Sequence, residues 1–380
     1  MNLSFQKMFF AIATVIALFA ILVLAKAILI PLSIALLLSF ILFPLAKRIE
    51  KLGMNRILAA FLSIFTMILI IGGAIFFFST QIIELTDEFS NFKNKIIHLF
   101  AEFTFYFNDN VSIIPNLEKN ELTERMQTWI SESTGSLVSK TVSSTATFFV
   151  GLLATFVFTF LILIYRRGLT EAFTQFSPEE KRPRVRNMFK SVQQVGQKYL
   201  VGMIFLTIVI GLANSIGLLI IGIDNPFLFG FMGAALAIIP YIGTSVGAII
   251  PILYAFMSYD SPWKAIAVAI LFWFVQLVAD NFLTPKIVGG SLKINALAAI
   301  LSLFIGAAVW GVAGMILFLP FAAMLKVVCE EFDELKPMAL IIGNHEISKK
   351  KGSKINAKKF MAKIPVIKTI IHATTKAGIK

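Results

Sequence analysis

Residues 227–258 decide the fold, and they read FLFGFMGAALAIIPYIGTSVGAIIPILYAFMS without one charged side chain. As a single straight helix these 32 residues would be about 48 Å long, whereas the hydrocarbon core of a bilayer is about 30 Å thick. Near the middle, Pro240 removes a backbone donor and Gly243 permits a turn. We therefore predict a helical hairpin with its tip at Pro240, Tyr241 and Gly243. A kinked helix that crosses the membrane once is the alternative.

Residues 295–328 form a second stretch of the same kind. This stretch is 34 residues long and is interrupted by three glycines, with Gly311 at the centre. Two hairpins would leave the intervening loop, with Lys286 and Lys293, in the cytoplasm, whereas two full spans would place it outside. The charges therefore favour hairpins for both stretches. Paired interrupted segments of this kind are a sequence sign of a transport site.

The remainder of the chain is also strongly apolar. Hydrophobic residues make up 58% of the 380 residues and charged residues only 14%, whereas about a quarter of a soluble domain is charged. Six further stretches approach the roughly 20 apolar residues that a membrane span needs. The predicted fold class is all-α, a polytopic helical membrane protein with about eight membrane-embedded segments, two of them re-entrant hairpins. These segments are residues 8–25, 27–46, 57–79, 146–165, 199–223, 227–258, 263–279 and 295–328.

Basic residues predict the orientation, because loops rich in Lys and Arg stay in the cytoplasm. Residues 47–56 contain four basic residues and one acid, and residues 166–198 contain eight basic residues and three acids. Residues 80–145 contain nine acids and five basic residues, so we expect them outside. Both termini are then cytoplasmic, and the expected location is the bacterial inner membrane. The predicted parts are three N-terminal membrane helices (1–79), an extracytoplasmic helical segment (80–145), a fourth span with a basic cytoplasmic loop (146–198), a transport half with interrupted helices (199–335) and a basic cytoplasmic tail (336–380).

Several classes of function are excluded by charge placement and by missing motifs. The net charge of +13 lies where the positive-inside rule requires it and no base-reading motif accompanies it, so nucleic acid is not an expected partner. The lipid bilayer is the expected partner of the basic tail. The chain has no Gly-x-Ser-x-Gly, no His-Glu-x-x-His and no phosphate-binding loop. We therefore predict no enzyme activity, no catalytic residue, no metal site and no cofactor.

Polar residues directly follow the apolar run at residues 263–279. An acid such as Asp280 is costly at membrane depth and is a functional candidate by default. Asn281 and Thr284 come next, and Pro285 frees a carbonyl group in the preceding turn. Together these groups can coordinate a small cation or hydrogen-bond a polyol. The alternative is that Asp280 and Asn281 only cap the end of the span.

Two amide side chains inside predicted spans also need hydrogen-bond partners. Asn214 lies in the span at residues 199–223, and Gln276 lies one turn before Asp280. Both are candidate binding residues, although such amides more often hold membrane helices together.

Three motifs carry a resemblance to a known family. They are Pro240-Tyr241-Ile242-Gly243 followed by Gly247 and Pro251, then Asp280-Asn281-Phe282-Leu283-Thr284-Pro285-Lys286-Ile287-Val288-Gly289, then Gly311 and Gly314 with Pro320-Phe321-Ala322-Ala323. With these motifs, residues 5–335 resemble the autoinducer-2 exporter family of permeases. Gly289 joins the candidate site through this resemblance. Two positions depart from the family pattern, because Asn295-Ala296 stands where His-Pro is common and Thr244 stands where Pro is common.

The resemblance implies a secondary transporter. Members export small polar or amphipathic molecules, autoinducer-2 among them, and others exchange sodium or lithium for protons. The resemblance also implies a homo-oligomer, such as a pentamer, that moves its substrate by an elevator-like shift. The expected substrate is therefore a small molecule or a monovalent cation. A channel-like pore and a structural membrane partner without transport are the alternatives from other classes.

Overall fold

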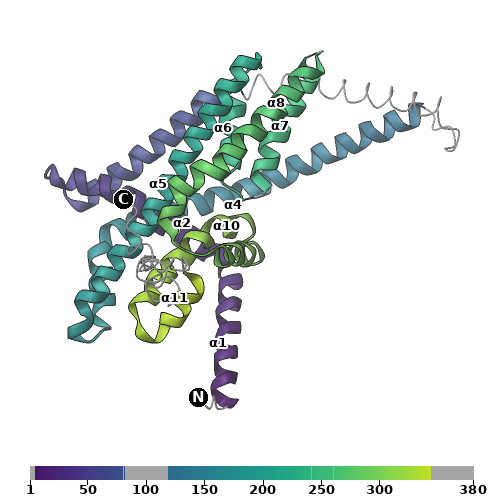
Figure 1. The fold of residues 1–380 in the computed structure, drawn as a ribbon. Coiled ribbons are helices and arrows are strands. Elements are labelled where there is room, and N and C mark those ends of the chain that lie inside the picture. Colours follow the sequence, from purple (N-terminus) through teal and green to yellow (C-terminus); the bar gives the residue numbers. More distant parts are fainter. Residues whose placement is uncertain (1–4, 80, 82–118, 241, 260, 344–380) are drawn as a thin grey trace, which may run out of the picture.

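The computed structural model describes residues 5–79, 81, 119–240, 242–259 and 261–343, and these fold almost entirely into helices (Figure 1). Most of the predicted extracytoplasmic segment, Tyr241 and most of the basic tail lie outside the described residues.

Long apolar helices dominate the described part of the chain. Six helices there are long and apolar enough to cross a membrane: Lys26–Lys51, Arg56–Ser79, Thr147–Gln175, Glu179–Ile221, Pro262–Gly289 and Ala296–Glu331. Three shorter apolar helices are Ile12–Leu24, Pro226–Leu236 and Ile242–Ser258. Each of the eight predicted segments coincides with one or two of these helices, so the all-α polytopic membrane fold is confirmed. Large apolar side chains such as Phe10, Leu153 and Ile220 are exposed, as expected of surfaces that contact lipid.

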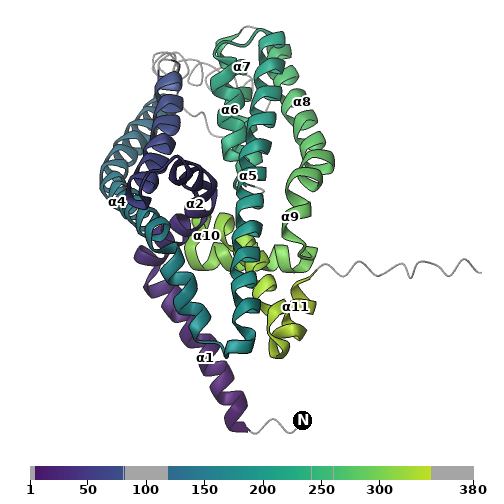
Figure 2. The ribbon, with the colours of Figure 1, turned by 90° about the vertical axis from the view of Figure 1, so that its left-hand side faces the viewer.

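The N-terminal helices are α1 (Phe5–Leu24), α2 (Lys26–Lys51), the helix Arg56–Ser79 and α4 (Lys119–Gln175). The last three pack around one small core. In this core Leu42 of α2 is buried against Ile64 of the helix Arg56–Ser79 and against Leu163 of α4. Helix α1 extends away from the other helices (Figure 2). Helix α4 is unbroken for 57 residues, so no helix break accompanies the predicted boundary between residues 145 and 146.

Helix α5 (Arg182–Ile221) is the axis on which the second half of the chain is built. Small residues lie where other helices cross it, and these allow close backbone approach. Gly196 faces Phe40 and Met324, whereas Gly211 faces Phe231 of the first hairpin. Figure 2 shows α6, α7 and α8 beside the later part of α5, and α10 and α11 beside its earlier part.

The first interrupted stretch is a helical hairpin. It consists of α6 (Pro226–Leu236) and α7 (Ile242–Ser258). Next to the turn, the backbone of Gly243 contacts the carbonyl group of Leu236. Farther from the turn, the rings of Phe229 and Tyr254 have their centroids 4.6 Å apart. The two helices are therefore antiparallel along their length.

The ends of this hairpin meet at one end of the molecule. The backbone N–H of Asp224 donates to the Tyr259 hydroxyl at 2.8 Å, and that hydroxyl donates to Oδ2 of Asp224 at 2.7 Å. Lys264, in α8 (Pro262–Val278), donates to the carbonyl oxygen of Gly222 at 2.8 Å. The hairpin is therefore confirmed, and the alternative of one kinked span is wrong.

Gly243 does not make the turn that the sequence analysis assigned to it. Its φ is not positive, and it lies in the first turn of α7. A Cβ at this position would overlap the carbonyl group of Leu236, so glycine is needed here for close packing of two helices.

The second interrupted stretch, α10 (Ala296–Glu331), is also a hairpin. Gly311 has φ 60° and ψ −136°, a conformation that is open essentially only to glycine. The helical arms on either side, residues 296–310 and 312–331, meet where Gly306 and Gly314 are in direct backbone contact. The sequence analysis placed the break across three glycines, and the structure locates it at Gly311.

Asn295 closes the base of this second hairpin. Its Oδ1 accepts from the N–H of Ala298 at 2.8 Å and so caps the first arm, and its Nδ2 donates to the carbonyl of Gly343 at 3.1 Å. Gly343 follows α11 (Lys336–Ile342) and lies against Lys326 near the end of the second arm. The start of the first arm and the end of the second arm therefore lie together, at the base of the hairpin. The position that departs from the family pattern has a structural role in this chain.

The hairpin assignment predicts a labelling result. In a Cys329→Ala background, which removes the buried native thiol, Asp224→Cys and Ser261→Cys should react with a membrane-impermeant maleimide from the same side of the membrane. Lys51→Cys, in a basic loop, should react only from the opposite side. Reaction of positions 224 and 261 from opposite sides would contradict the hairpin.

Candidate functional site

The two hairpins approach from opposite ends of α5. The base of the first lies beside Gly222, which directly follows α5. The end of the second is tied to the start of α5, because Arg184 donates to Glu331 at 2.6 Å. Since α5 has 40 residues and is about 60 Å long, the bases of the two hairpins lie far apart along it. Trp310, next to the break of the second hairpin, donates to the carbonyl oxygen of Leu22 in α1 at 2.9 Å.

The helix that carries Asp280 does not end there. After α8 it continues through two π-helical turns, η2 (Ala279–Leu283) and η3 (Pro285–Gly289), into α9 (Gly290–Leu292). The N–H of Thr284 donates to the carbonyl of Ala279, five residues back. Pro285 has no N–H to donate, which explains a local departure from α-helical bonding. π-Helical turns inside helices are frequent at functional sites. The alternative that Asp280 only caps the end of a span is wrong.

Asp280 is paired with Gln276. The side-chain Nε2 of Gln276 donates to Oδ1 of Asp280 at 2.8 Å, which leaves the other carboxylate oxygen for a ligand. The side-chain Nδ2 of Asn281 instead donates to the backbone carbonyl oxygen of Leu277, one turn earlier in the same helix, at 2.8 Å. The structure therefore brings two of the predicted polar residues together and turns a third away.

The tip of the first hairpin lies in the same neighbourhood. Ala234, three residues before the turn, belongs to one buried cluster with Ala279 and Val288 of the π-helical segment. Leu319 of the second hairpin packs against that cluster. Both hairpins and the Asp280 segment thus share one packing region beside α5.

The other predicted site residues have varied surroundings. Pro240 is half-buried in the turn, Thr284 is half-buried, and Pro285 and Gly289 are exposed. Asn214 is buried in α5, and its Oδ1 has no hydrogen-bond partner in the described part of the chain. The described residues contain no cluster of His, Cys, Asp and Glu that could hold a metal ion.

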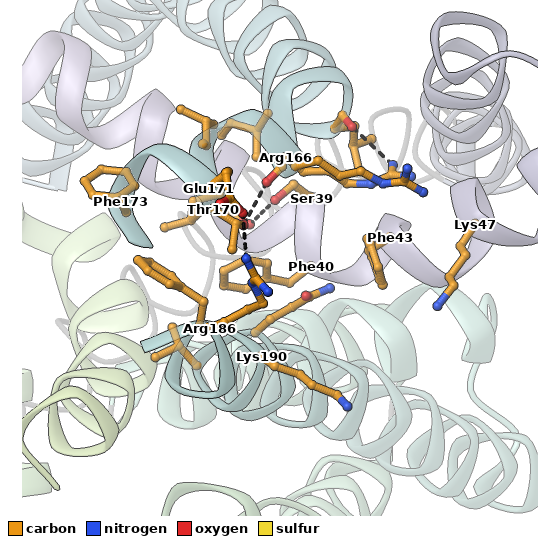
Figure 3. Close-up of a pocket in the computed structure, with 18 of the residues that line it drawn as sticks. Ser39, Phe40, Phe43, Lys47, Arg166, Thr170, Glu171, Phe173, Arg186 and Lys190 are labelled. Atoms are coloured by element: carbon orange, nitrogen blue, oxygen red, sulfur yellow. Dashed lines mark hydrogen bonds and ion pairs between the residues drawn. The ribbon is translucent and has the colours of Figure 1, made fainter. Parts of the chain in front are cut away.

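A pocket that the sequence analysis missed lies between α2, α4 and α5. Its volume is about 820 Å³ (Figure 3). Five residues of its lining are cationic and two are acidic: Lys47, Arg166, Arg167, Arg186 and Lys190, with Glu50 and Glu171. The sequence analysis used these basic residues only to orient the chain. One feature of the sequence could have revealed the pocket. Its basic residues come from three segments, the ends of the apolar runs of α2 and α4 and the region before the apolar run of α5, and all three segments are predicted at the same membrane face.

Comparison with known proteins places the chain among transporters. The family described as AI-2E family transporter matches residues 12–334. YueF of Bacillus subtilis (strain 168), provisionally named a transport protein, is 27% identical over 310 residues, 78% of this chain and 82% of that protein. YrrI of the same organism, named in the same way, is 26% identical over 327 residues, 81% of this chain and 87% of that protein. The AI-2 transport protein TqsA of Escherichia coli (strain K12) is 24% identical over 332 residues, 84% of this chain and 90% of that protein.

Proposed function

Because this chain belongs to the AI-2E family of transporters, we propose that it is a secondary carrier that exports small polar molecules such as autoinducer-2. The family and the long apolar helices identify the chain as a multi-pass membrane transporter. We place it in the bacterial inner membrane with both termini in the cytoplasm, in line with the basic loops.

The observation that carries the proposal is the pair of hairpins that enter from opposite ends of α5. Such an arrangement lets a central site open to one side while the other hairpin closes it, as alternating access requires. A continuous pore would need both hairpins open together. The geometry therefore favours a carrier over a channel.

Asp280 and Gln276 are the proposed centre of the site, with Thr284 nearby, Pro240 in the turn of the first hairpin and Gly243 next to that turn. Tyr241, between these two in the sequence, remains a predicted site residue. The second carboxylate oxygen of Asp280 has no hydrogen-bond partner in the described part of the chain, so it can bind a monovalent cation or a proton while the amide of Gln276 holds the carboxylate in place. Exchange of sodium or lithium for protons is the second candidate function, and the carboxylate of Asp280 is the observation that favours it.

The surroundings of Asp280 support an assembly of several chains. Asp280 is exposed in the single chain, and so are its apolar neighbours Trp273 and Phe282. A carboxylate is too costly to face lipid, so we expect a second copy of the chain or a water-filled cavity to cover it. A homo-oligomer is therefore part of the proposal.

Flux measurements on purified protein in liposomes test this function. With a pH-sensitive dye inside, a gradient of sodium or lithium should drive proton movement if the chain is an antiporter. Movement of autoinducer-2 that saturates with concentration would support export. Large unitary currents would instead identify a channel, and absence of any flux with correctly folded protein would overturn the transporter assignment.

A further inference from the structure

The pocket between α2, α4 and α5 has cations from three separate parts of the sequence at one level. Lys47 follows the apolar part of α2, Arg166 and Arg167 follow that of α4, and Lys190 precedes that of α5. Cations that end apolar spans lie at the depth of lipid headgroups. The pocket therefore lies at the boundary between membrane and water, on the face of the basic loops.

The acids of the pocket are already engaged. Glu50 pairs with Arg166, and both side chains are only 14% exposed. Glu171 pairs with Arg186 at 2.8 Å. The first pair is well shielded from water, whereas the second is exposed and contributes little by itself.

Three cations of the pocket have no acidic partner among the described residues. They are Lys47, Arg167 and Lys190, and all three are exposed. Lys47 lies over the ring of Phe43 with 5.9 Å between its Nζ and the ring centroid, and Arg166 lies over the same ring at 5.1 Å. Figure 3 shows Lys47 on α2 and Lys190 on α5, and both line the pocket. This part of the pocket is thus a cationic surface whose positive charge no acidic side chain among the described residues compensates.

Most of the remaining lining is apolar. Leu36 and Phe40 of α2 and Ile162 of α4 line the pocket on the side of the membrane spans. Leu169 and Phe173, in the last turns of α4, also line it and are 44% and 55% exposed. An occupant that satisfies the whole pocket must carry a negative group at one end and a hydrocarbon chain at the other.

We propose that this pocket binds the headgroup of an anionic phospholipid. The phosphate lies against Arg167, Lys190 and Lys47, and an acyl chain lies along Leu36 and Phe40. Arginine and lysine are the usual partners of phosphate, and basic pockets between membrane helices on the cytoplasmic side are recognised by anionic headgroups. A soluble phosphate would leave the apolar wall uncovered. The bound lipid would bridge the N-terminal helices α2 and α4 to α5, the axis of the transport half.

Native mass spectrometry of the full chain in detergent tests the proposal. Phosphatidylglycerol should bind more tightly than phosphatidylcholine with the same acyl chains. Each cation that contacts the headgroup contributes about fivefold to such binding, so the double variant Arg167→Gln, Lys190→Gln should lose about twentyfivefold. The matched control is Lys51→Gln, Arg56→Gln. It removes two exposed charges in the basic segment 47–56, which begins with Lys47 of the pocket, but neither residue lines the pocket. Its affinity should stay within about twofold of the parent.

Three results would overturn the proposal. The first is equal binding of phosphatidylglycerol and phosphatidylcholine, and the second is an equal loss in both double variants, which would indicate general surface charge. The third is displacement of bound phosphatidylglycerol by inorganic phosphate or glycerol phosphate at comparable concentration, which would identify a soluble anion as the occupant. Equal elution profiles of the variants on size exclusion confirm that the comparison is between folded proteins.

Discussion

Replacing Asp280 with asparagine is expected to reduce coupled transport by at least about tenfold. Asparagine keeps the shape of the side chain and can still accept the 2.8 Å hydrogen bond from Gln276, but it removes the negative charge. A tenfold loss corresponds to about 1.4 kcal/mol of stabilisation, lost here because the charge that would hold a coupling ion or substrate is gone. The measurement is the initial rate of flux in liposomes at equal protein density.

Two further variants separate the charge of Asp280 from its position. Gln276→Leu keeps the carboxylate but removes the hydrogen bond that orients it, so its loss of flux should be smaller than that of Asp280→Asn. Asp224→Asn is the matched control, because it neutralises an acid that instead accepts from Tyr259 at the base of the first hairpin. Its flux should stay within about twofold of the parent. Normal flux in Asp280→Asn with normal insertion would assign Asp280 a structural role only.

The second large effect is expected from Gly243→Ala. The added methyl group would overlap the carbonyl group of Leu236, and this neighbour is backbone, which cannot rotate away as a side chain can. The tip of the first hairpin must then open. Overpacking of this kind typically costs about 1–3 kcal/mol. We expect a lower yield of folded protein, a lower midpoint in a heating series followed by size exclusion, and impaired flux in the protein that survives.

Gly151→Ala is the control for this substitution. Gly151 lies within α4, and nothing is within 4 Å of a Cβ built there. Alanine is the better helix former, so this change should leave the midpoint unchanged or raise it. Gly314→Ala should behave like Gly243→Ala, because its methyl group would overlap the backbone of Gly306 in the second hairpin. If Gly243→Ala and Gly151→Ala have the same midpoint, close packing at the hairpin tip is not needed for stability.

The membrane spans and both hairpins were predictable from the sequence because their causes are local. Hydrocarbon thickness sets the length of an apolar run, and a run of 32 or 34 residues with a central Pro or Gly is too long for one straight span, which favours folding back. The likeness of the motifs to a transporter family was also readable in the chain, and the match over residues 12–334 confirms it. Asp280 was found as a candidate because an acid after an apolar run is rare, and its role stays a prediction.

Other features depended on contacts between distant segments, and only the tertiary structure decided them. The sequence analysis gave Gly243 the turn, but the fold uses it for packing against Leu236, because glycine permits both and the neighbour decides. Gly311 alone combines a central position with positive φ in the second hairpin. The pocket was missed because Lys47, Arg167 and Lys190 are up to 143 residues apart in the chain and converge only when α2, α4 and α5 pack together. Hydropathy and charge along the sequence determine which segments enter the membrane and which face their loops occupy, whereas the packing of helices determines which side chains share a site.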